Sequence, residues 1–110
     1  MPNFYNWADL KYFPMNDKVG RQQINAERLS ILRITLQQGG AVPLHNHPNE
    51  QISVLISGRV EFNVNGDKKV LTPGDVVVVP ENLPHGVEAL EDSVIVESFN
   101  PPRYDLMPKE

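Results

Sequence analysis

The three histidines of this 110-residue chain stand where they could meet around one metal ion. His45 and His47 are two residues apart, so both imidazoles project to the same face if the segment is extended. Gln51 follows four residues after His47 and keeps that parity. His85 comes later, where an antiparallel neighbouring strand could bring it opposite the pair. Three neutral imidazoles and one amide oxygen would form a metal site with open positions.

The fourth ligand has two candidates in the sequence, Glu50 and Gln51. Parity along an extended segment favours Gln51. With glutamine as the ligand, the protein adds no negative charge, so a divalent ion keeps its full charge and is a stronger Lewis acid. The imidazole-rich set suits Ni, Zn, Fe, Mn or Cu, and the residues do not select among them.

A second group of chemically capable side chains lies near the C-terminus. Glu97 and Phe99 would share one face of a strand, and the rigid Asn100-Pro101-Pro102 segment leads on to Arg103. At a barrel mouth, this group would suit an acidic sugar: the guanidinium grips a carboxylate, the ring stacks on the sugar and Glu97 moves protons. The alternative is a surface glutamate, a core phenylalanine and a solvated arginine, and spacing alone leaves it open.

These residues need strands to position them, and the regular spacing of turn residues along the chain predicts strands. Gly58, Gly66 and Gly74 follow one another at steps of eight residues. Evenly spaced turns between short apolar stretches are typical of an all-β sandwich or barrel. The expected strands cover residues 29–36, 51–57, 60–64, 69–71, 75–79 and 94–99. The Asn65-Gly66 pair predicts a type I′ turn, and helical turns are expected only at the far ends of the chain.

Two apolar segments raise the question of what covers them. Val76 to Val79 are apolar on both faces of their strand, which predicts a strand covered on both sides. Ile52, Val54 and Ile56 share the face opposite Gln51, so they would lie outside a barrel whose interior holds the ligands. We expect a homodimer to cover this face; the alternative is the chain's own N-terminal strand.

The composition of the chain excludes several kinds of site and partner. The chain has no cysteine, a net charge of −4 and a pI near 5.3. Disulfides and thiolate ligands are therefore excluded, and nucleic acid is not an expected partner because no basic cluster could neutralise a row of phosphates. Neither a spanning segment nor a signal peptide is expected, so the expected location is cytoplasmic. We expect one domain over residues 1–110 with a core at about 27–100, an N-terminal arm and a C-terminal tail.

The segments around the histidines resemble the two motifs of the cupin family. The run from Gly39 through His45-Asn46-His47-Pro48-Asn49-Glu50-Gln51 to Gly58 resembles the first motif. The run from Gly74 through Pro80 to Pro84-His85 resembles the second. The resemblance implies a double-stranded β-helix, the jelly-roll barrel of this family. It also implies metal ligands at His45, His47, Gln51 and His85.

The sequence departs from the cupin pattern at two positions. Asn82 stands where the second motif has a glycine, and Ala89 stands where it ends in asparagine. Asparagine is among the few other residues that adopt a positive φ, so Asn82 is compatible with the glycine's conformation.

The chain is most similar to the small single-domain cupins of pectin degradation. They share His-x-His-Pro-x-Glu-Gln and a tail of acidic-x-Phe-x-Pro-x-Arg. That group converts 4,5-unsaturated monouronates from pectin or alginate to linear keto sugar acids. The resemblance implies catalytic roles for Glu97, where aspartate is the usual residue, and Arg103, and substrate contacts by Phe99 and Arg103. Two alternatives remain, a quercetinase-like metal-dependent dioxygenase and a non-catalytic sugar-binding cupin.

Overall fold

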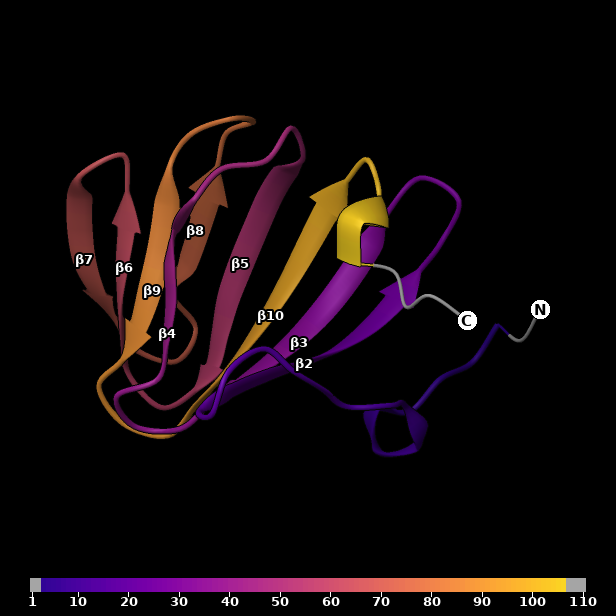
Figure 1. Cartoon of the computed structure of the whole chain (residues 1–110), viewed down its shortest axis with the longest axis horizontal. Coiled ribbons are helices and arrows are strands. Elements are labelled where there is room, and N and C mark those ends of the chain that lie inside the picture. The colour runs from indigo at the N-terminus through magenta and orange to yellow at the C-terminus, as the bar shows by residue number, and fades with distance from the viewer. Residues whose placement is uncertain (1–2, 107–110) are drawn as a thin grey trace.

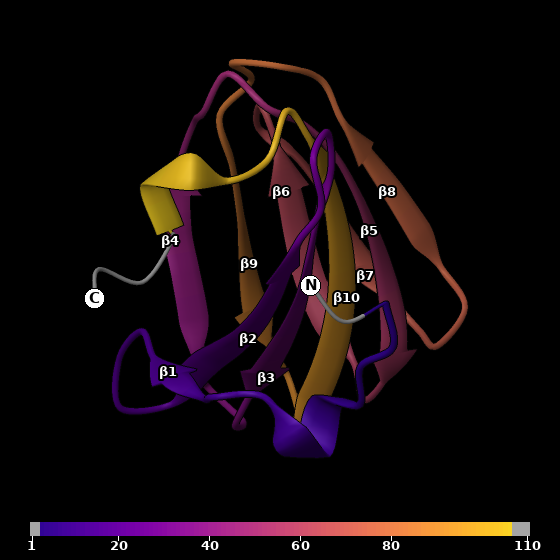
Figure 2. The same ribbon diagram turned by 90° about the vertical axis from the view of Figure 1, so that its right-hand side faces the viewer.

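The computed structural model describes residues 3–106 and consists of two antiparallel sheets that face each other (Figure 1, Figure 2). The six-stranded sheet has the order β1-β2-β3-β10-β5-β8, and the four-stranded sheet has the order β4-β9-β6-β7. The strands are β1 (Phe13–Pro14), β2 (Val19–Asn25), β3 (Ser30–Leu36), β4 (Ala41–His45), β5 (Glu50–Ser57), β6 (Val60–Val64), β7 (Asp67–Leu71), β8 (Val76–Val79), β9 (His85–Ala89) and β10 (Ser93–Asn100). Short 3₁₀ turns, η1 (Trp7–Asp9) and η2 (Tyr104–Leu106), lie near the two ends of the described chain.

The hydrophobic core lies between the two sheets because alternate side chains of each strand point inward. In β3, every second residue from Ser30 to Leu36 is buried. The buried apolar cluster draws on both sheets and consists of Val19, Leu32, Ile34, Leu36, Leu55, Val60, Phe62, Leu71, Val79, Val87, Ala89, Ile95 and Phe99. This arrangement confirms the all-β fold predicted from the turn spacing.

The turns form where the residue types allow them. Asn65 and Gly66 have φ values of 52° and 90° and join β6 to β7, which is the conformation that a type I′ turn requires. Asn82 has a φ of 62°, so it takes the left-handed conformation expected of the glycine it replaces. The short-range predictions for these two turns are confirmed.

Strand β2 was not predicted. Because it begins at Val19, the sheet starts before residue 27, where the sequence placed the beginning of the core. Its sequence is polar, and part of its outer face is covered by the N-terminal arm. Gln22 Nε2 donates to the backbone oxygens of Trp7 at 2.6 Å and Leu10 at 2.9 Å. Since Val19 belongs to the core, β2 is part of the folded sandwich.

The prediction that Val76 to Val79 is covered on both faces is wrong. Within the described part of the chain, strand β8 is the edge of the six-stranded sheet and pairs with β5 alone. Val79 is buried, but Val76 and Val78 are 57% and 59% exposed, because nothing in residues 3–106 lies over their outer face. In the neighbouring strand, Ile52 and Ile56 are 46% and 52% exposed. Strand β1 does not cover them, since it pairs with β2 at the opposite edge.

The described part of the chain contains no helix long and apolar enough to cross a membrane.

Candidate metal centre

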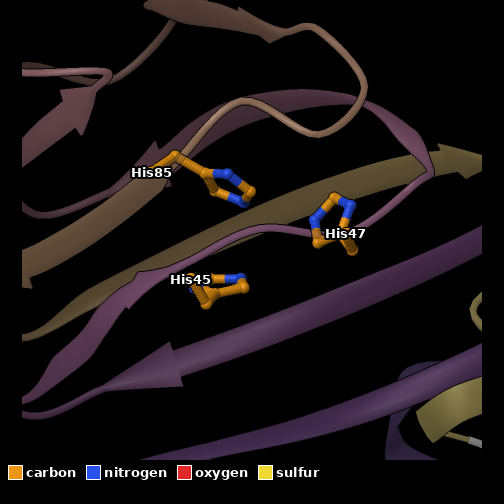
Figure 3. A group of neighbouring side chains, drawn as sticks. All are labelled: His45, His47 and His85. Atoms are coloured by element: carbon orange, nitrogen blue, oxygen red, sulfur yellow. The ribbon is translucent and has the colours of Figure 1, made fainter.

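Strand pairing brings the three histidines together. His45 at the end of β4 is directly opposite His85 at the start of β9, and His47 follows in the loop that leads into β5. The three rings point toward one another (Figure 3), and the nearest candidate ligand atoms all lie within 4.8 Å. An antiparallel neighbouring strand thus brings His85 opposite His45, as the sequence allowed.

Backbone hydrogen bonds set the orientation of all three imidazoles. Each histidine donates its Nδ1–H to a carbonyl oxygen two residues away, at 2.8 Å for His45 and His85 and 3.0 Å for His47. Because a carbonyl can only accept, the proton is on Nδ1. Each Nε2 therefore keeps a free lone pair, as a metal-binding imidazole requires.

Burial keeps two of these rings neutral. The pKa of His85 is lowered from 6.5 to about 4, first by its burial and then by the neighbouring histidines. The pKa of His47 is also lowered, again chiefly by burial and next by the Arg103 charge. A neutral imidazole is the form that binds a metal, so neither ring needs to lose a proton near neutral pH.

Two observations show that this donor set fits a cation. His85 Nε2 is buried and has no hydrogen-bond partner among residues 3–106. His47 Nε2 lies 3.0 Å from Gln51 Oε1, and with the proton on Nδ1 both of these atoms are acceptors. Two facing acceptors and one orphaned lone pair are satisfied together by a positively charged ion. The residues present therefore fit a divalent transition metal.

The structure distinguishes the two candidates for the fourth ligand. Gln51 is 3% exposed and faces the histidines, whereas Glu50 is exposed on the other face of β5. The residues between His47 and Glu50 do not form a strand. Strand β5 nevertheless begins at Glu50 in an orientation that points Gln51 inward, as the parity argument predicted.

Glu97 lies behind Gln51 and lines the same cavity. Its Oε2 accepts hydrogen bonds from Gln51 Nε2 at 2.9 Å and from Ser53 Oγ at 2.7 Å. Withdrawal from bulk water raises the pKa of this carboxyl, partly offset by the Ser53 hydrogen bond and the Arg103 charge. Ser53 was not singled out from the sequence, although it shares the inward face of β5 with Gln51.

Arg103 reaches the cavity wall from the segment after β10 and is 7% exposed. Asp105 holds the guanidinium from the other side: Arg103 Nε and Nη2 each donate to a different carboxylate oxygen of Asp105 at 3.0 Å. The guanidinium lies over the Phe99 ring, 4.8 Å from its centroid. Asp105 was another residue that sequence reasoning missed, because its role depends on how the tail folds back.

Phe99 differs from its predicted role. Its side chain is 1% exposed and is not among the residues that line the cavity. The ring packs between the Arg103 guanidinium and the His47 ring, whose centroid is 5.6 Å away. Phe99 therefore packs against two site residues. Because its ring is buried, it cannot stack on a sugar in this structure.

The cavity has a volume of about 270 Å³ and two kinds of wall. Its polar part is formed by His45, Gln51, His85, Glu97 and Arg103. The remainder is largely apolar and consists of Met15, Leu32, Ile34, Val42, Pro43, Leu44, Phe62, Gly86, Val87, Ile95 and Leu106. This volume admits a small molecule with one acidic or polar side.

The family model for the cupin domain matches residues 32–98 of the chain. The chain belongs to the cupin family. This cupin is 29% identical over 96 residues to the pectin degradation protein KdgF of Dickeya dadantii, across 84% of this chain and 87% of the relative. The predicted resemblance to the pectin-degradation cupins is thereby confirmed.

Two solved structures match almost the whole cupin. An RmlC-like cupin from Shewanella frigidimarina has a TM-score of 0.92, with 97% of each chain covered. KdgF from Halomonas sp. has a TM-score of 0.91 and covers 97% of this chain and all of its own. Both are 26% identical to this chain. The jelly-roll fold expected from the motifs is therefore confirmed.

Proposed function

We propose that this cupin is a metal-dependent enzyme acting on small acidic sugars, which converts 4,5-unsaturated monouronates from pectin or alginate to linear keto sugar acids. The observation that carries the proposal is that His45, Gln51, His85, Glu97 and Arg103 all open onto one cavity. A metal site, an acid–base group and a carboxylate anchor are thus within reach of one small substrate. The similarity to KdgF supports the choice of substrate class.

The metal would be held by the Nε2 atoms of His45, His47 and His85 and by Gln51 Oε1. When bound, it supplies Lewis acidity toward an oxygen of the substrate. Arg103 binds the C6 carboxylate through the Nη1 side of its guanidinium, because Nε and Nη2 are occupied by Asp105. Glu97 exchanges a proton through Oε1, because Oε2 already accepts two hydrogen bonds.

The reaction is an isomerisation that takes up and returns one water. Glu97 delivers a proton to C4 of the enol ether, and water adds its hydroxyl to C5, leaving its proton on the carboxylate. The resulting hemiketal opens when the bond between C5 and the ring oxygen breaks and the proton of the C5 hydroxyl passes to that oxygen, which gives the C5 ketone and two hydroxyls on C1. The hydrated C1 then loses water to become an aldehyde. The apolar wall of the cavity suits the face of the sugar that lacks a 4-hydroxyl.

The test is an assay on freshly made 4,5-unsaturated galacturonate with metal-loaded protein. The enol ether absorbs in the ultraviolet, so its loss is followed directly. We expect decay faster than the spontaneous rate, and a return to that rate after chelation or in His47→Ala. Arg103→Ala should raise KM, whereas Arg28→Ala, which removes an exposed arginine that does not line the cavity, should leave KM unchanged. Decay at the spontaneous rate with metal bound would refute the uronate reaction.

A metal-dependent dioxygenase is the second candidate, and the apolar part of the cavity wall favours it. An aromatic substrate would use Leu32, Ile34 and Phe62 more fully than a sugar does. Oxygen uptake with an aromatic diol, coupled to no turnover of the uronate, would support this candidate. Binding of uronate without turnover and without oxygen uptake would instead support a non-catalytic sugar-binding cupin.

The cytoplasmic location expected from the sequence stays a prediction.

A further inference from the structure

The side-chain amide of Gln51 is held on its nitrogen side by two hydrogen bonds. Its Nε2 donates to Ser53 Oγ at 2.8 Å and to Glu97 Oε2 at 2.9 Å. Ser53 Oγ in turn donates its single proton to the same Glu97 oxygen at 2.7 Å. Gln51 and Ser53 are 3% and 1% exposed, so water does not compete for these groups. The three side chains therefore form a closed triangle of hydrogen bonds.

This triangle distinguishes between the two possible orientations of the Gln51 amide, which exchange its oxygen and its nitrogen. If the amide were turned over, Gln51 Oε1 would face the carboxylate oxygen of Glu97, and two acceptors would lie against each other. The one proton of Ser53 could satisfy only one of them. Turning the amide over would therefore leave a buried acceptor, either Glu97 Oε2 or Gln51 Oε1, without a donor, even when Glu97 carries its proton on Oε1. The triangle thus holds the NH₂ group away from the histidines.

We propose that Ser53 and Glu97 are positioning residues that hold the Gln51 amide with its carbonyl oxygen toward the metal. Neither residue lies among the candidate ligands, so both act on the ion through Gln51. This inference rests on the metal site of the proposed function but not on the sugar substrate. Glu97 uses Oε2 for this role, which leaves Oε1 for the cavity.

The proposal is tested by measuring Co²⁺ affinity against a competing chelator, together with the visible absorption of the bound ion. We expect Ser53→Ala to weaken Co²⁺ binding about tenfold, as loss of an orienting partner typically does, and to change the absorption bands. Ser93→Ala is the matched control: Ser93 is also buried in β10 and hydrogen-bonded, but to Arg59 and Glu91. It should keep wild-type affinity and spectrum even if its melting temperature falls.

A double-mutant cycle with Gln51→Ala separates positioning from general damage. If Ser53 acts through Gln51, adding Ser53→Ala to Gln51→Ala should cause no further loss of Co²⁺ affinity. A further tenfold loss in the double variant would overturn the proposal, as would a Ser53→Ala protein with wild-type affinity and spectrum.

The outcomes for the inference and for the proposed function are distinguishable. A wild-type protein that fails to bind Co²⁺ would refute the metal site and this inference together, whatever the uronate assay gives. The expected Co²⁺ results without any uronate turnover would leave the inference standing and refute only the reaction.

Discussion

At the scale of single residues, the candidate site depends on which atoms carry protons. The backbone carbonyls that accept from Nδ1 leave the Nε2 atoms of His45, His47 and His85 as acceptors. The hydrogen bond between Gln51 Nε2 and Glu97 leaves the amide oxygen of Gln51 facing His47 Nε2 at 3.0 Å. Because these lone pairs gather without a donor of their own, the site is electrostatically prepared for a cation.

Asp105 gives a prediction at this scale, because its pKa depends on Arg103. The pKa of Asp105 is lowered from 3.8, first by the hydrogen bond from Arg103. A lowered folded-state pKa stabilises the protein at pH values above 3.8, and this stabilisation is lost as the pH falls through the folded value. The Asp105 side chain is 58% exposed, so the solvent-screened contribution is about 0.5 kcal/mol.

Asp105→Asn should therefore lower the free energy of unfolding by about 0.5 kcal/mol at neutral pH. The difference from wild type should shrink as the pH is lowered from neutral to below 3.8. Urea unfolding at both pH values measures it. A difference that does not change with pH would show that the carboxylate charge is not responsible.

At the scale of elements, two glycines with the same backbone conformation have different surroundings. Gly58 joins β5 to β6 with a φ of 89°, and Gly66 joins β6 to β7 with a φ of 90°. A Cβ on Gly58 would fall on Ser93 Oγ and on the carbonyl oxygen of Asp92, whereas a Cβ on Gly66 would meet no described atom within 4 Å. Gly58 therefore serves both the turn and the contact with the start of β10.

Alanine substitutions at these positions separate the two contributions. Gly66→Ala should cost about 1–2 kcal/mol of unfolding free energy, which is the cost of a left-handed alanine. Gly58→Ala adds the steric cost of an overfilled contact and should lose more than about 3 kcal/mol in total. Urea denaturation monitored by circular dichroism gives both values. Equal losses would mean that the β5–β6 turn moves freely away from β10.

At the scale of the whole molecule, the outer face of the six-stranded sheet is covered unevenly. The N-terminal arm lies over part of β2, where Gln22 is bonded to it. The face over β5 and β8 carries Ile52, Ile56, Val76 and Val78, each about half exposed. An antiparallel sheet that faces water normally has polar residues there. A second copy of the chain presenting the same face would cover these side chains around a twofold axis.

We expect the protein to be a homodimer through this face. Light scattering coupled to size exclusion should give a mass about twice 12.4 kDa for the wild type. Val78→Lys, which places a charge opposite Ile52, should give the monomer mass. Val70→Lys is the control, since Val70 is 44% exposed on β7 of the other sheet and should leave the dimer intact. A monomeric wild type would contradict this expectation.

The sequence by itself determined the properties that depend on neighbouring residues. The spacing of His45 and His47, the turn at Asn65-Gly66 and the positive φ of Asn82 follow from side-chain parity and from intrinsic backbone preferences. For His85 the sequence only allowed a position opposite His45, and the resemblance to the second cupin motif implied it. The pairing of β4 with β9 placed it there.

Only the tertiary structure decided the properties that depend on distant strands. Val76 and Val78 are exposed because nothing in residues 3–106 lies over the outer face of β5 and β8, and no feature of four consecutive valines indicates this. Phe99 is buried because its ring faces the core between the sheets and the tail after β10 places Arg103 over it. The contact between Ser53 and Glu97 requires β5 and β10 to pair in one register, and long-range pairing is set by the whole core and not by local sequence.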